Sequence, residues 1–146
     1  MKLIAHRGLF DGPDSTVENT VEQIELALSK GYDVELDVWQ IGNTFYLGHD
    51  KPESAISASW LENSAFWIHA KNTQALDTLR HLNVFWHQSD DYTLTSAGFI
   101  WCYPGKSVPI TKSILVMPES AGISIDKIMH TDYYGVCSDY VGALHV

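Results

Sequence analysis

Two short stretches of sequence decide the expected fold, KLIAHRG at residues 2–8 and GYDVELDVW at residues 31–39. Each is an apolar run that closes in ionisable residues, which is typical of a buried strand ending at the rim of a sheet. Between them, Thr20 and Gln23 match a helix capping box, and Gly31 stands where that helix would stop. The order strand, helix, strand predicts a βαβ unit.

The same alternation continues through the rest of the chain. The turn-like segment IGNT at residues 41–44 predicts that the second strand folds back as a hairpin ending at Gly48. Further strands are expected at residues 66–71, 84–88, 98–103, 113–117 and 135–138, and further helices at residues 73–81 and 124–130. This order indicates a mostly parallel sheet, either open and doubly wound or closed into a barrel. We expect one α/β domain over residues 1–146, a compact TIM-type (β/α) barrel of seven or eight strands, complete or incomplete.

Composition and charge exclude several classes of protein. Apolar residues make up 45% of the chain, and nine basic against eighteen acidic residues give a net charge of -9. That charge opposes nonspecific attraction to nucleic acid or to an anionic bilayer, so no nucleic-acid partner is expected. Cys102 and Cys137 lie in apolar runs and are expected to be reduced core residues. Without a signal peptide or a long apolar stretch, the expectation is a cytoplasmic protein with no stable membrane insertion, of undetermined oligomeric state.

Glu35 and Asp37 are the first candidates for a functional site. They are two residues apart on an expected strand, so both side chains point to the same face of the sheet. Two ionised carboxylates in a confined site repel each other unless a cation lies between them, and a hard divalent ion with oxygen ligands resolves that conflict. The alternative is an ordinary exposed strand face.

Other ionisable residues follow the same positional pattern. His6 and His49 each end an apolar run, and two such imidazoles can divide proton removal and proton donation between them. Arg7 is suited to clamp a phosphate, and His69 and Lys71 share one face of a later strand. Each residue taken singly has a structural alternative, a surface ion pair or a core histidine.

Several motifs, in order and spacing, closely resemble the signature of the glycerophosphodiester phosphodiesterase family, within the superfamily of PLC-like phosphodiesterases. The amino-terminal motifs are IAHRG at residues 4–8, VENT at 17–20, GYDVELDV at 31–38 and LGHD at 47–50. Two later segments are also similar, WIHAK at residues 67–71 and GVCSDYV at residues 135–141. The middle of the chain carries little of the resemblance.

The resemblance implies a TIM barrel that uses a divalent metal to hydrolyse a glycerophosphodiester to an alcohol and glycerol 3-phosphate, a reaction of lipid metabolism. It also implies a role for each matching residue: His6 and His49 as general acid and base, Arg7 and Lys71 as phosphate ligands, Glu35 and Asp37 as metal ligands, and Glu18 and Asn19 as supports of the rim. In the family mechanism, the glycerol hydroxyl attacks phosphorus, and water then opens the cyclic phosphate.

This chain departs from the family pattern at three points. The family's third metal carboxylate is His69 here, and an imidazole suits Mn²⁺, Co²⁺, Ni²⁺ or Zn²⁺ better than Mg²⁺ or Ca²⁺. We therefore expect one divalent ion, Mg²⁺, Ca²⁺ or Mn²⁺, with a shift towards a transition metal or weaker binding. The chain also lacks most of the family's insertion after Asp50, which predicts an open cleft, and its Trp-Thr-Val-Asn strand is missing.

Three functions remain in competition. The leading one is a metal-dependent phosphodiesterase acting on a small-molecule glycerophosphodiester, with a lipid head group as the alternative substrate. The second is a catalytically degenerate relative that binds a phosphorylated ligand or metal without turnover. The third is a lyase in which Lys71 forms a Schiff base. This hypothesis assigns no role to Glu35 and Asp37.

Overall fold

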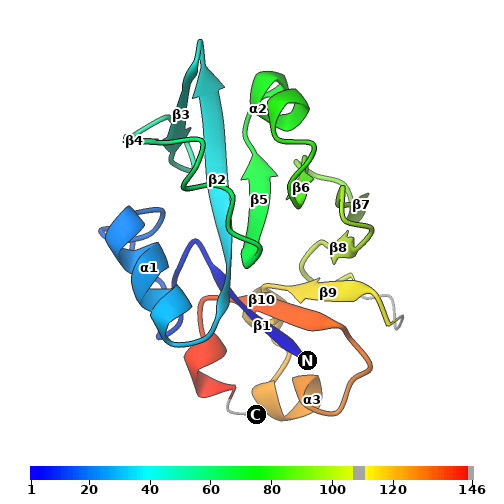
Figure 1. The fold of residues 1–146 in the computed structure, drawn as a ribbon. Coiled ribbons are helices and arrows are strands. Elements are labelled where there is room, and N and C mark those ends of the chain that lie inside the picture. The colour runs from blue at the N-terminus through cyan, green and yellow to red at the C-terminus, as the bar shows by residue number, and fades with distance from the viewer. Residues whose placement is uncertain (107–110, 145–146) are drawn as a thin grey trace.

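The structure is a computed structural model that describes residues 1–106 and 111–144. These residues form one ten-stranded sheet with short helices packed against it (Figure 1). The strands are β1 (Lys2–His6), β2 (Asp33–Ile41), β3 (Thr44–Leu47), β4 (Ser54–Ile56), β5 (Phe66–Ala70), β6 (Val84–Phe85), β7 (Tyr92–Leu94), β8 (Ile100–Cys102), β9 (Ser113–Val116) and β10 (Gly135–Ser138). The helices are α1 (Val21–Ser29), α2 (Thr73–Thr78) and α3 (Ile125–Ile128), with 3₁₀ turns η1 (Pro118–Ala121) and η2 (Val141–Ala143).

The sheet is mixed and curls into a half-barrel. Parallel pairings join β6, β5, β2, β1, β10, β9 and β8 in that order, while β7 pairs with β8 in the antiparallel sense. One edge of β2 pairs first with β1 and then, further along, with β3, which carries β4 beside it. Among the described strands, β6 and β8 do not pair, so the curve stays open on that side.

The expected TIM-type barrel is therefore wrong. A TIM barrel places a helix after every strand and needs ~250 residues to do so. Here the connections from β6 to β7 and from β7 to β8 contain no helix, and β7 reverses direction as one arm of a hairpin. The expectation of parallel strands was met in most of the sheet, but the chain is too short to supply the alternating helices.

The first βαβ unit forms as its local signals predict. The Thr20 hydroxyl accepts a hydrogen bond from the Gln23 backbone N–H, so α1 begins at the expected cap. At the other end, the Tyr32 N–H donates to the Ala27 carbonyl across Gly31, whose φ of +89° favours glycine. This cap turns the chain back along β1, and β2 then pairs with it in parallel.

The remaining elements agree with the expectations only in part. The hairpin of β2 and β3 is confirmed, as are the strands β9 and β10. The strand expected at residues 84–88 is reduced to β6, and the helix expected at 73–81 ends at Thr78. The short strands β4 and β7 were not expected, because three-residue strands carry too little periodicity to be recognised.

The alternation of side chains along the strands separates the core into two clusters. Val34, Leu36 and Val38 of β2 belong to the cluster that packs against α1 and α2 on the outer face. The inner cluster is built around large aromatic side chains, of which Trp67 and Trp101 are each only 3% exposed. These rings fill the inside of the curved sheet. Cys102 and Cys137 are both buried and are not joined in a disulfide, as expected for core residues.

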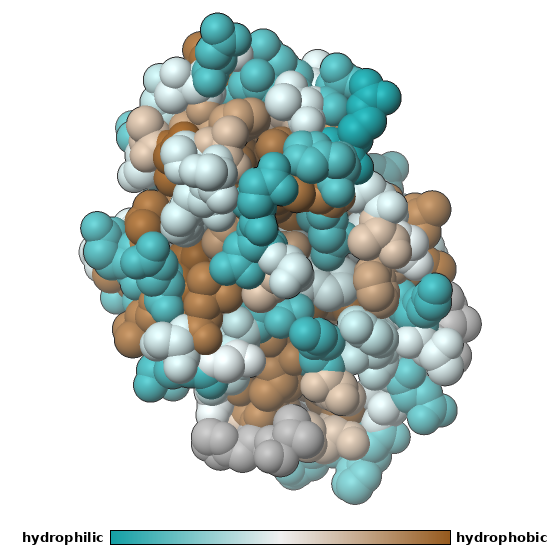
Figure 2. Space-filling view, in the orientation of Figure 1, coloured by the Kyte–Doolittle hydropathy of each residue, from teal (hydrophilic) through white to brown (hydrophobic). Residues whose placement is uncertain are grey.

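Few helices cover the outer face of the sheet. On the side shown in Figure 2, apolar residues therefore come to the surface between hydrophilic ones. In the described part of the chain, no helix is long and apolar enough to cross a membrane.

The turn after β3 gives a test of the fold. A Cβ on Gly48 would lie 1.9 Å from the Lys51 carbonyl oxygen, at a φ of +149°. We expect Gly48→Ala to lower the free energy of unfolding by about 2–4 kcal/mol, measured by urea denaturation. Gly42→Ala is the matched control: its φ is also positive, at +60°, but nothing lies within 4 Å of the added carbon. Equal destabilisation by the two substitutions would contradict this account of the turn.

Candidate functional site

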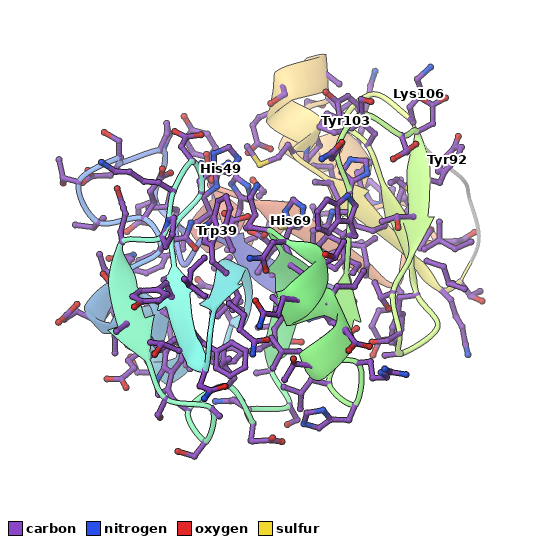
Figure 3. All side chains as sticks on the ribbon, turned by 90° about the horizontal axis from the view of Figure 1, so that it is seen from above. Trp39, His49, His69, Tyr92, Tyr103 and Lys106 are labelled. Carbon is purple, nitrogen blue, oxygen red and sulfur yellow. The ribbon has the colours of Figure 1, made fainter. Side chains whose placement is uncertain are left out.

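A pocket of about 410 Å³ opens on the inner side of the sheet, at the carboxyl ends of the parallel strands. It is lined by all the residues expected to act in catalysis, phosphate binding or metal binding: His6, Arg7, Glu35, Asp37, His49, His69 and Lys71. In Figure 3, which looks down on this side, His49 and Tyr103 lie to either side of His69. The structure thus brings residues from four separate motifs to one place.

Strand register sets the order of the central residues. His6 of β1 pairs with Glu35 of β2, and Asp37 of β2 pairs with His69 of β5. Because all four point to the inner face, their side chains form neighbouring rows. Glu35 and Asp37 are buried, at 3% and 1% exposed, so the alternative of an exposed strand face is wrong.

Each buried carboxylate has one oxygen held by protein donors. Glu35 Oε2 accepts from the Arg7 backbone N–H at 3.2 Å. Asp37 Oδ2 accepts from Asn19 Nδ2 at 2.9 Å, and the Asn19 side-chain Oδ1 accepts from the Asp37 backbone N–H at 3.0 Å. The reciprocal pair requires Asn19 to adopt a φ of +54°, a conformation that asparagine tolerates better than most residues. These bonds fix the orientation of both carboxylates.

The other two carboxylate oxygens face His69. Its Nδ1 lies 3.1 Å from Asp37 Oδ1 and 3.8 Å from Glu35 Oε1. Its Nε2 lies 2.8 Å from the backbone carbonyl of His87, which can only accept, so Nε2 donates this hydrogen bond. His69 Nδ1 is therefore the ring nitrogen that faces the two carboxylates, and Asp37 Oδ1 is buried with no hydrogen-bond partner.

This arrangement fits a divalent ion. One ligand atom from each of Glu35, Asp37 and His69 lies within 4.8 Å of the others. The other oxygen of each carboxylate and the other ring nitrogen of His69 are hydrogen-bonded to a backbone or amide group. Such support is usual for residues that bind a metal. Two oxygens and one imidazole nitrogen suit Mn²⁺ or a later transition metal as well as Mg²⁺.

Burial and charge shift the two carboxylates in opposite directions. Burial, followed by the charge of Asp37, raises the pKa of Glu35 above its usual range. Burial alone would also raise the pKa of Asp37, but the contact with His69, the hydrogen bond from Asn19 and the Arg7 charge outweigh it and hold this pKa below its usual range. A pair with split pKa values is typical of a functional site.

His6 is held by a residue that sequence reasoning did not assign. Its Nδ1 lies 2.7 Å from Asp139 Oδ1, just after β10, and its Nε2 lies 3.8 Å from Glu35 Oε2. Burial works to lower the pKa of His6, but the hydrogen bond to Asp139 and the Glu35 charge outweigh it, so the pKa is raised. Asp139 itself is fixed by Glu119, whose Oε1 accepts from its backbone N–H at 3.1 Å.

The sequence indicated the segment that contains Asp139 but not the contact that this residue makes. It lies in the motif GVCSDYV, which suggests a closing strand, yet nothing in the sequence links it to His6, 133 positions away. The two meet because β1 and β10 are neighbours in parallel register. A pairing across the full length of the chain is a tertiary property.

The two expected phosphate ligands are held near Asp37. Arg7 adopts a φ of +53° just beyond β1, and its NH1 donates to Glu18 at 3.1 Å, while Nε lies 3.4 Å from Asp37 Oδ2. Lys71 Nζ lies 3.8 Å from Asp37 Oδ1, and its side chain is only 17% exposed. Lys71 therefore points into the pocket, and the alternative that it simply reaches solvent is wrong. Glu18 and Asn19 lie where they can orient Arg7 and Asp37.

His49 lies at the rim of the pocket. The Trp39 indole N–H donates to the Gly48 carbonyl at 2.6 Å, and Gly48 N–H bonds to the Asp37 carbonyl, so the chain ahead of His49 is anchored to β2. The His49 ring lies 2.8 Å from Asp50 and is 39% exposed. It lines the pocket and is also open to solvent.

The opposite wall of the pocket was not recognised from the sequence. It is formed by residues that carry no fixed charge, from the ends of β6, β8 and β9: His87, Gln88, Trp101, Tyr103, Pro104, Val116 and Met117. His87 and Tyr103 meet with ring centroids 5.4 Å apart. This wall contrasts with the charged side and suits the less polar part of a ligand.

The chain was compared with protein-family models, curated proteins and solved structures, and none of them matches it. The resemblance described above therefore depends on the sequence motifs alone.

The contact between Asp139 and His6 gives a test of this geometry. Because the hydrogen bond to Asp139 contributes to the raised pKa of His6, we expect Asp139→Asn to lower that pKa, measured by NMR titration of the imidazole resonances. Asp50→Asn is the control, since Asp50 contacts His49 and not His6. An unchanged His6 titration in Asp139→Asn would show that the two do not pair in solution.

Proposed function

We propose that this protein is a metal-dependent phosphodiesterase that hydrolyses a small glycerophosphodiester to glycerol 3-phosphate and an alcohol. The observation that carries the proposal is the meeting, in one pocket, of Glu35, Asp37 and His69, which we call the metal-binding triad for its proposed role, with His6 and two cationic side chains. Each alone has a structural explanation. Together they match the needs of phosphodiester cleavage, which requires charge neutralisation, a proton acceptor and a proton donor.

Arg7 and Lys71 supply the charge that attracts the phosphodiester. Both line the pocket beside Asp37, so a bound phosphate would lie at the carboxylate pair. Glu35, Asp37 and His69 would hold the divalent ion. When bound, such an ion neutralises the charge of the phosphoryl oxygens and favours attack on phosphorus.

His6 is placed to act as the general base. Its Nδ1 is taken by Asp139, which leaves Nε2 to accept the proton of the attacking hydroxyl. Attack by the substrate's glycerol hydroxyl forms a new P–O bond and breaks the bond to the alcohol, whose oxygen takes a proton from His49. Water then opens the cyclic phosphate, with the two histidines exchanging roles.

The alcohol half of the substrate is expected to lie against the uncharged wall. This wall leaves the pocket open beyond Tyr103, which is 40% exposed, in keeping with the short connection after Asp50. The shared phosphodiester chemistry also allows a lipid head group, so the assay should include both kinds of substrate.

A binding function without turnover is the second candidate. The observation that favours it is the position of His49, whose described hydrogen bond goes only to the exposed Asp50. A general acid held so loosely would protonate the leaving alcohol slowly. In that case, the protein would bind a phosphate ester and a metal and release them unchanged.

Activity distinguishes these candidates. We expect hydrolysis of glycerophosphodiesters with Mn²⁺ or Mg²⁺, loss of activity with a chelator, and a decrease in kcat/KM of about 100-fold or more in His6→Ala. Phosphate products would be identified by ³¹P NMR. His81→Ala is the matched control, because His81 pairs with Glu62 away from the pocket. Binding of substrate without product in any metal would favour the second candidate.

The identity of the metal depends on His69. We expect His69→Glu to raise the affinity for Mg²⁺ and Ca²⁺ relative to Mn²⁺ and Zn²⁺ by about 10-fold, because a third carboxylate suits hard ions. His69→Ala should weaken the binding of every ion. Isothermal titration calorimetry measures both changes, and tight Ca²⁺ binding that His69→Ala leaves unchanged would exclude His69 as a ligand.

A further inference from the structure

The two cationic side chains of the pocket are held in different ways. Arg7 pairs with Glu18 through NH1, and its Nε lies near Asp37 Oδ2. That oxygen also accepts from Asn19, and it is not the oxygen that lies next to His69 Nδ1. Arg7 can therefore keep both acidic partners, Glu18 and Asp37 Oδ2, without moving.

Lys71 contacts the other oxygen. Among the described residues, its one ion pair is with Asp37 Oδ1, at 3.8 Å. This separation is too long for a hydrogen bond, so the contact is electrostatic and easily exchanged. The ammonium sits on a flexible stem with several rotatable bonds, which lets it turn without moving β5.

Asp37 Oδ1 is also the oxygen that faces His69, another member of the metal-binding triad. It lies 3.1 Å from His69 Nδ1 and is buried without a hydrogen-bond partner. A divalent ion bound there would take over this oxygen and repel the nearby ammonium. Lys71 and the ion therefore compete for the same atom.

We propose that a divalent ion displaces Lys71 from Asp37 and so makes it available to bind the phosphate of the substrate. Metal and phosphate then bind cooperatively, and Lys71 carries part of the coupling between them. This inference rests on the proposed function, since it requires both a metal and a phosphate in this pocket.

The coupling can be measured without turnover, with Mn²⁺ and glycerol 3-phosphate as the probes. Calorimetry and NMR titration would give the affinity for each probe, alone and with the other at saturation. In Lys71→Met we expect Mn²⁺ to bind about 3- to 10-fold more tightly, because a competing charge is removed. Glycerol 3-phosphate should lose about 10-fold in affinity with Mn²⁺ present but less than about 2-fold without it.

Two further variants complete the experiment. Lys127→Met removes the same charge from an exposed position on α3 and should leave all four affinities unchanged. Lys71→Arg keeps the charge and should retain most of the coupling, which guards against misfolding of Lys71→Met. An equal loss of phosphate affinity with and without Mn²⁺, or unchanged Mn²⁺ affinity in Lys71→Met, would overturn the coupling alone. Failure of the wild-type protein to bind either probe would overturn the proposed function with it.

Discussion

The burial of two carboxylates side by side on β2 is the constraint on which the rest of the site depends. Glu35 and Asp37 lie on the inner face, almost removed from solvent, where like charges repel strongly. To remain buried, the two carboxylates require hydrogen-bond donors and cations from elsewhere in the chain. Asn19 comes from the turn ahead of α1, Arg7 from the end of β1, and His69 from β5. The elements that supply these partners are the ones packed directly around β2.

The aromatic layer explains how so short a chain builds a pocket at all. Inside the half-barrel, Trp67, Phe85 and Trp101 fill the space below the ionisable residues. Trp67 also donates to the buried Asp33 at 3.0 Å, which ties this layer to the start of β2. The large rings replace the volume that more residues would supply in a full barrel, and they give the site an apolar floor.

Most of the charged side of the site could be read from the sequence, because its residues end short strands with clear signals. The spacing of Glu35 and Asp37 is enough to place both on one face, and the cap at Thr20 is enough to start α1. The uncharged wall could not be read, because His87 and Tyr103 lie beyond strands of two or three residues. Such strands exist only through their neighbours in the sheet. The expectation of a barrel with alternating helices was wrong because the described residues place no helix between β2 and β5 or between β6 and β8.

The sequence by itself determined the strand and helix order from β1 to β3, the shared face of the two carboxylates and the burial of the cysteines. These properties follow from local periodicity, capping and hydropathy, which act over a few residues. Only the tertiary structure decided that the sheet stays open, that Asp139 supports His6 and that Lys71 faces Asp37. The physical reason is that these contacts depend on which strands become neighbours, and that choice minimises the exposure of the whole core at once.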